Sequence, residues 1–180
     1  MFVTPETFLY DTSHASTSTS AKGGFTMANA LTFIMPLEEG VDLAKLGEAL
    51  VGNQKQIDEA LVAVGTVHFA RFVVFDNSAP NLLPSPESKG PFSLSVITDY
   101  DGDFDAYIEA FVQYLGPIFD ALLSFSADGK SLVPVAQNVS AFEKYITQND
   151  ASQQPPNDVM SLYSAYPYTV QQILANPPPT

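Results

Sequence analysis

The sequence predicts a single α+β domain whose core elements follow the order strand, helix, strand, strand, helix, strand. Segments rich in β-branched and aromatic residues alternate with segments whose apolar residues recur every three or four positions. The chain also has 180 residues, of which 46% are apolar, so it is long enough to bury one hydrophobic core.

The first strand is expected over residues 30–37, an apolar run with the sequence ALTFIMPL. A helical period follows it. Its apolar positions are Leu43, Leu46, Leu50, Ile57, Leu61 and Val64. Asp42 suits the N-cap of this helix, and Gly65 suits the position just past its end. Because Gly47 and Gly52 weaken the middle, we expect either one helix or two helical pieces here.

The second and third strands are expected over residues 66–76 (TVHFARFVVFD) and 92–98 (FSLSVIT). They should pair as a hairpin, although the loop between them, residues 77–91, is far longer than hairpin loops usually are. This loop contains several prolines and the apolar pair Leu82 and Leu83. We therefore predict that it is a surface element that contacts a partner.

The second long helix is expected after Asp103, with apolar residues at helical spacing as far as residue 122. Pro117 predicts a kink or a restart within it. Residues 131–139 predict the fourth strand, with Pro134 inside it. A short helix over residues 141–146 and a final aromatic, partly helical segment complete the elements.

Composition divides the chain into an N-terminal extension or arm (1–28), the α+β domain (29–149) and a C-terminal aromatic tail (150–180). Residues 11–20 are polar and aperiodic, which is typical of a linker. Met27 is an alternative start, because regular structure is expected to begin just after it. The first residues do not resemble a secretory signal, and the chain has no cysteine, so we expect a cytoplasmic protein.

The charge of the chain argues against two classes of partner. Twenty acidic residues against seven basic ones give a net charge of −13 at pH 7, and Arg71 is the only arginine. Nucleic acids and anionic lipids need clusters of basic residues, so we expect no nucleic-acid binding. No apolar run is long enough for membrane insertion. Without cysteine, zinc–thiolate and iron–sulfur sites are excluded, and we predict no metal site.

The alternation of the strands assigns their faces. In the third strand the apolar set beneath the helices is Phe92, Leu94 and Val96. In the second strand, Arg71 shares a face with Phe69, Val73 and Phe75, whereas His68 falls on the face assigned to the helices. An unpaired arginine buried beneath apolar helices is costly, so the face of Arg71 should be free of helices. That face is apolar enough to need a cover, which predicts a homodimer or a higher oligomer.

This order of elements is the ferredoxin-like one, and with an apolar helix-free face it resembles the dimeric α+β barrel superfamily. The resemblance covers residues 29–140 and implies two sheets packed face to face around a cavity. Dye-decolorizing peroxidases in that superfamily carry a Gly-x-x-Asp-Gly motif. Here Asp101-Gly102 follows Thr98-Asp99-Tyr100, without the first glycine, so their haem chemistry is not carried over.

A cavity on the helix-free face gives a set of candidate ligand-binding residues. They are Arg71, His68, Phe69, Asp99 and Tyr166. A lone arginine in an acidic chain suits bidentate binding of an anion, or a structural ion pair with Asp99 or Asp76. His68 is interpreted as a general base, a haem ligand or a hydrogen-bonded core histidine.

Residues 99–105 (DYDGDFD) place four carboxylates close together. Such a cluster suits a calcium or magnesium ion, or the capping of the helix that follows. An EF-hand is excluded because no glutamate closes the loop. Aspartates before an amphipathic helix are usually caps, which is the interpretation favoured here.

From these features we expect a small-molecule binding protein with an apolar cavity on the helix-free sheet face, for a small apolar or anionic ligand. One alternative is a structural or assembly subunit that docks through its terminal arms. Another is a haem-dependent or cofactor-free oxidoreductase that uses the same cavity. The sequence contains no complete catalytic motif, so it assigns neither an enzyme activity nor a cofactor.

Overall fold

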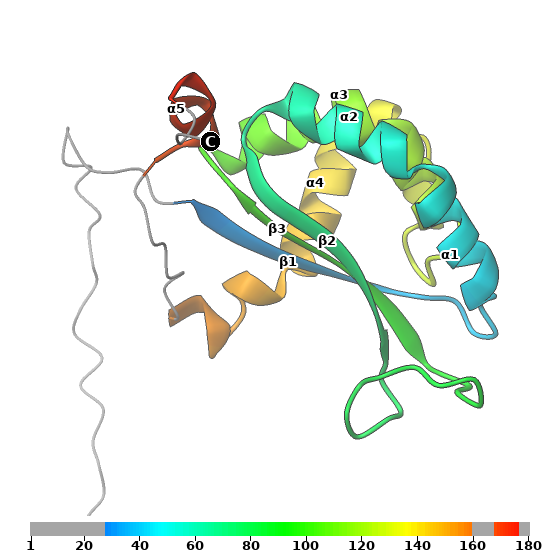
Figure 1. The fold of residues 1–180 in the computed structure, drawn as a ribbon. Helices are drawn as coiled ribbons and strands as arrows, with labels where there is room; N and C mark the ends of the chain where they lie inside the picture. The colour runs from blue at the N-terminus through cyan, green and yellow to red at the C-terminus, as the bar shows by residue number, and fades with distance from the viewer. Residues whose placement is uncertain (1–27, 160–167, 177–180) are drawn as a thin grey trace, which may run out of the picture.

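The computed structural model describes residues 28–159 and 168–176 and confirms the α+β class (Figure 1). Its centre is a three-stranded antiparallel sheet with the strand order β1-β3-β2. The strands are β1 (Asn29–Pro36), β2 (Val67–Asp76) and β3 (Phe92–Tyr100). The longer helices are α1 (Leu43–Gly52), α2 (Gln54–Val64), α3 (Phe104–Leu123) and α4 (Val139–Gln148). They pack against one face of the sheet.

The first helical region forms two pieces, as its glycines allow. Asp42 caps α1 by accepting hydrogen bonds from the backbone N–H groups of Ala44 and Lys45. Gly65 ends α2 in the left-handed conformation, with φ of +69°. The predicted cap and the predicted end are both confirmed.

The central helix α3 is continuous, so the predicted restart at Pro117 is wrong. Asp103 caps it, as expected, through the N–H groups of Asp105 and Ala106. Leu115 and Ile118 on either side of the proline are both buried, and this packing holds the helix together across the lost hydrogen bond. No helix in the described ranges is both long and apolar enough to cross a membrane.

The predicted fourth strand does not form, so the full ferredoxin-like order is not observed in the described residues. Residues 130–137 instead make two short 3-10 helices, η1 (Lys130–Leu132) and η2 (Val135–Gln137). Pro134 separates them and has no N–H group to give to a sheet. Val135 is fully buried against the helices, and its N–H donates to Asp120 Oδ1 at 2.8 Å. The apolar residues that suggested a strand therefore fill the helical layer.

The outer edge of β1, where a fourth strand would pair, is covered by the residues that follow α4. Figure 1 shows this segment, which includes η3 (Ala151–Gln153) and η4 (Asn157–Val159), beside β1. The N–H of Ile34 donates to the carbonyl of Asn149 at 2.9 Å, and the N–H of Thr32 donates to Asp150 Oδ1 at 2.9 Å. A carboxylate and a carbonyl thus satisfy edge groups that a strand would otherwise pair.

Strand β3 carries the centre of the core. Leu94 is fully buried, and Thr98 Oγ1 lies 3.1 Å from the hydroxyl of Tyr107 on α3. Tyr100 stacks on Tyr107 with ring centroids 4.1 Å apart. Burial raises the pKa of Tyr100 to about 12. These contacts fix the start of α3 over the end of β3.

The face of the sheet away from the helices has the composition that the sequence predicted. In the β2–β3 register, Arg71 lies opposite Ile97 and Val73 lies opposite Ser95. Arg71 and Phe69 are exposed, and Phe69 keeps 66% of its surface accessible. Self-association through this face stays a prediction.

The long hairpin loop is anchored at its base. The carboxylate of Asp76 is buried, and its Oδ1 accepts the N–H of Ser78 at 2.9 Å and the hydroxyl of Ser78 at 2.6 Å. The bond from the Ser78 hydroxyl is the main cause that lowers the pKa of Asp76. Leu82 and Leu83 at the tip are exposed by 46% and 62%, and their contact with a partner stays a prediction.

Replacing Asp150 by alanine tests the covering of the β1 edge. Asp150 is only 3% exposed, and its removal leaves the N–H of Thr32 without its acceptor. We expect Asp150→Ala to lower the free energy of unfolding by about 2 kcal/mol in urea denaturation. Asp158→Ala, which removes an exposed carboxylate from the same segment, should change it by much less. Equal losses in the two variants would contradict this role.

Candidate functional site

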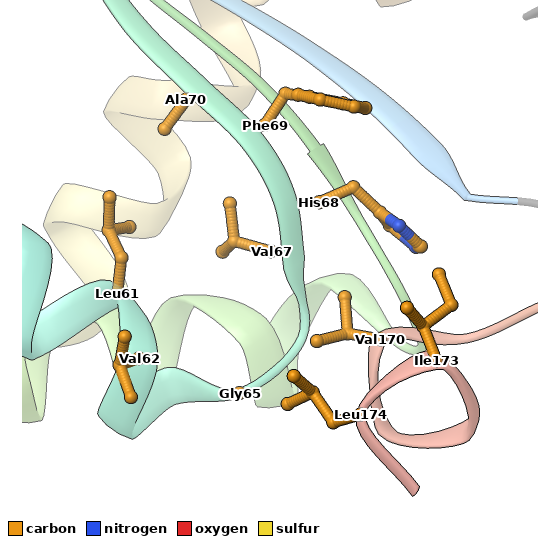
Figure 2. A pocket seen from close by; sticks show the side chains of 10 residues that line it. All are labelled: Leu61, Val62, Gly65, Val67, His68, Phe69, Ala70, Val170, Ile173 and Leu174. Carbon is orange, nitrogen blue, oxygen red and sulfur yellow. The ribbon is translucent and has the colours of Figure 1, made fainter. Parts of the chain in front are cut away.

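A pocket of about 440 Å³ lies at the outer edge of β2, between α2 and the short helix α5 (Val170–Ala175). Figure 2 shows the side chains that line it. They are Leu61, Val62, Val67, His68, Phe69, Ala70, Val170, Ile173 and Leu174, and the backbone of Gly65 completes the lining. The volume falls within the range of small-molecule sites, which is about 300–1,000 Å³.

An irregularity at the start of β2 shapes this pocket. The register shifts between Val67, which pairs with Tyr100, and Phe69, which pairs with Asp99. His68 is therefore the extra residue of a β-bulge. Val67 packs against the core, and Figure 2 shows His68 pointing to the other side of the strand, toward α5. The prediction that His68 lies beneath the helices is wrong, because strict alternation along the strand assumes that there is no bulge.

Among the described residues, His68 is the one polar side chain that lines the pocket, and it is paired. Its Nε2 lies 2.9 Å from Oδ1 of Asp101, and the two side chains are 7% and 9% exposed. Asp101 directly follows β3, and its own N–H donates to the carbonyl of Thr66 at 2.8 Å. The ends of β2 and β3 thus place the two side chains against each other.

The same aspartate holds α5 in place. Asp101 Oδ2 accepts the N–H of Val170, the first residue of α5, at 2.7 Å. A second bond runs from Nε2 of Gln171 to the carbonyl of Gly65 at 2.8 Å. Thr169 and Gln172 form a capping box at the start of the helix. These contacts hold α5 in a position where its apolar residues form one wall of the pocket.

The other predicted ligand-binding residues are not part of this lining. Arg71 is exposed, and within residues 28–159 and 168–176 it forms no ion pair, with Asp99 and Asp76 included. Asp99 lies on the helix-free face, opposite Phe69. Tyr166 lies outside the described residues. Of the predicted set, the structure therefore brings together His68 and Phe69.

The acidic run at residues 99–105 is divided between structural tasks. Asp103 caps α3, and Asp101 binds His68 and α5. No group of three or more potential metal-ligating side chains occurs in the described part of the chain. Sequence reasoning missed the role of Asp101 because its partners are distant in the chain.

The apolar wall contributed by α5 was also missed. Its lining residues are Val170, Ile173 and Leu174, a spacing that is typical of one helical face. That spacing was a usable signal for an apolar helix face. The spacing does not reveal which surface this face contacts. The position of α5 is set by hydrogen bonds to Asp101 and Gly65, which are distant from it in the sequence.

One polar atom beside the pocket is left unsatisfied. The hydroxyl oxygen of Thr66 is the only side-chain polar atom that is both fully buried and without a hydrogen bond in the described residues. A buried hydroxyl without a partner costs stability. Its position next to Val67 and His68 ties that cost to the bulge.

A pair of threonine variants tests this cost. Thr66→Val should leave the free energy of unfolding unchanged or raise it by up to about 1 kcal/mol, because it removes an unpaired hydroxyl. Thr98→Val, which removes the partner of the Tyr107 hydroxyl, should lower it by about 1–2 kcal/mol. Urea denaturation measures both. A large loss in Thr66→Val would show that its hydroxyl has a partner after all.

A second set of variants tests the docking of α5. Asp101→Ala removes the acceptor of the Val170 N–H, so amide hydrogen exchange over residues 170–175 should become faster than in the wild type. His68→Phe keeps that acceptor and should change the exchange much less. Asp99→Ala is the matched control, since Asp99 makes no side-chain hydrogen bond within the described residues. Equal exchange in Asp101→Ala and Asp99→Ala would contradict the docking role.

Comparisons of this chain with protein-family models, with curated proteins and with solved structures found no match. Among the described residues, the His68–Asp101 pair is the one polar feature of the pocket lining.

Proposed function

We propose that this protein binds a small, largely apolar molecule in the pocket between α2, β2 and α5. The observation that supports this is the composition of the lining, in which the described residues place a single polar side chain, His68, among aliphatic and aromatic ones. Small-molecule sites typically combine apolar walls with a few fixed polar groups. Here the polar group is fixed by its hydrogen bond to the buried Asp101.

The proposed apolar cavity lies at the edge of β2 and not on the helix-free face, where the sequence led us to expect it. Burial of apolar ligand surface against the walls contributes about 25 cal/mol per Å². The walls on β2 and α2 are parts of the packed domain, and α5 is held by hydrogen bonds from Val170 and Gln171. A preorganised site loses little conformational entropy when its ligand binds.

An apolar ligand fits the site better than an anionic one. Arg71, the residue expected to bind an anion, does not line the pocket. Asp101 lies directly behind His68, and the whole chain carries a net charge of −13. Both charges oppose a carboxylate or a phosphate in this position.

The composition of the pocket also favours binding over catalysis. Within residues 28–159 and 168–176, the side chains that line it include no serine, threonine, tyrosine, lysine or carboxylate beside His68. A histidine without a nucleophile or a second acid–base group fixes the orientation of a ligand, but supplies only part of a catalytic machinery.

Self-association is a second candidate function. Three of the most exposed large apolar side chains, Val62, Phe69 and Leu174, line the rim of this one pocket. They keep 80%, 66% and 66% of their surface accessible. Clustered exposed apolar side chains are typical of surfaces that bind either a ligand or a second copy.

Filling the pocket separates these functions. Ala70→Trp places a large ring on the lining, so the affinity for the neutral fluorescent probe N-phenyl-1-naphthylamine should fall by about tenfold or more. Val51→Trp is the matched control, because Val51 is 77% exposed on α1 and does not line the pocket.

Fluorescence titration measures the affinities, and light scattering on the same samples reports the oligomeric state. Equal affinity in the two variants, or no saturable binding to the wild type, would contradict the proposed function. A dimer that Ala70→Trp disrupts would support self-association instead.

A further inference from the structure

The two oxygens of Asp101 determine which nitrogen of His68 carries a proton. Oδ2 accepts the N–H of Val170 at 2.7 Å, and a backbone amide can only donate. Oδ1 lies 2.9 Å from Nε2 of His68. An ionised carboxylate has no proton to donate, so Nε2 is the donor in its contact with Oδ1. The proton of the neutral imidazole therefore sits on Nε2.

With its proton on Nε2, a neutral imidazole presents a lone pair at Nδ1. No residue within the described ranges bonds to Nδ1 of His68. Nδ1 is also not among the fully buried, unpaired side-chain atoms of those ranges, where Thr66 Oγ1 stands alone. Since His68 lines the pocket, its free acceptor is available to a molecule bound there.

We infer that the ligand is an apolar molecule bearing a hydroxyl group, a phenol or an alcohol, whose O–H donates to Nδ1 of His68. This inference rests on the proposed function and names its ligand class. The hydroxyl matches Nδ1 of His68, the one polar side-chain atom without a bond that the described lining residues offer. The rest of the molecule lies against the aliphatic and aromatic walls.

Ligands whose polar group only accepts hydrogen bonds fit less well. A ketone, ether or carboxylate would bring a lone pair toward the lone pair of Nδ1. The single side-chain donor among the described lining residues, Nε2–H of His68, is already bound to Asp101. A carboxylate would in addition approach the charge of Asp101. The site therefore discriminates by hydrogen-bond direction as well as by shape.

Three probes with the same naphthalene ring test this class: 2-naphthol, 2-methoxynaphthalene and 2-naphthoate. The hydroxyl compound should bind about tenfold more tightly than its methyl ether, because only the hydroxyl compound can donate to Nδ1. The naphthoate should bind more weakly than the ether. In His68→Phe the preference for naphthol over the ether should disappear, while the ether still binds.

Nitrogen NMR provides a second measurement that needs no variant. The ring nitrogens of His68 should show the Nε2–H tautomer, and the Nδ1 resonance should shift on addition of 2-naphthol but not of the ether. Equal affinities of naphthol and the ether for the wild type, or an unchanged ratio in a folded His68→Phe, would overturn the ligand class while the proposed function stands. Tightest binding of naphthoate would overturn it in favour of an imidazolium donor. If no probe binds, including N-phenyl-1-naphthylamine, the proposed function itself fails.

Discussion

The carboxylate of Asp101 binds side-chain and backbone groups from two other parts of the chain at once. It follows β3, binds the bulged His68 of β2 and holds the first N–H of α5, which lies 69 positions further along the chain. The pocket lies where β2 and α5 meet α2, and Asp101 fixes both its polar group on β2 and its wall on α5. At 9% exposure Asp101 is largely removed from water, so its charge depends on these donors for stabilisation.

Most of the fold was predictable because its signals are local. The caps at Asp42 and Asp103, the left-handed glycine at position 65 and the β-branched strands all act within a few residues of where they are read. The absence of a fourth strand was not predictable, because the apolar residues around Val135 suit a strand and a buried 3-10 turn equally well. What decides between them is a tertiary bond to Asp120 on α3.

The candidate site was predictable only in part. The composition of β2 pointed to His68 and Phe69, but strict alternation placed His68 on the wrong side. A bulge adds one residue to one strand, and its presence depends on the partner strand rather than on the bulged sequence. The pairing of His68 with Asp101 and the docking of α5 depend on contacts distant in sequence, which periodicity within one segment cannot show.

The two edges of the sheet differ in a way that limits how it can grow. The edge of β1 is closed by Asn149 and Asp150, whereas the outer edge of β2 meets no strand in the described part of the chain. Any strand added by another molecule thus finds backbone groups to pair with on one side only. Two such sheets can pair through their open β2 edges. A continuous fibre needs strand pairing at both edges of every sheet, so a sheet with one closed edge does not form one. The contacts of Asn149 and Asp150 thus occupy one of the two edges at which another strand could pair in the described part of the chain.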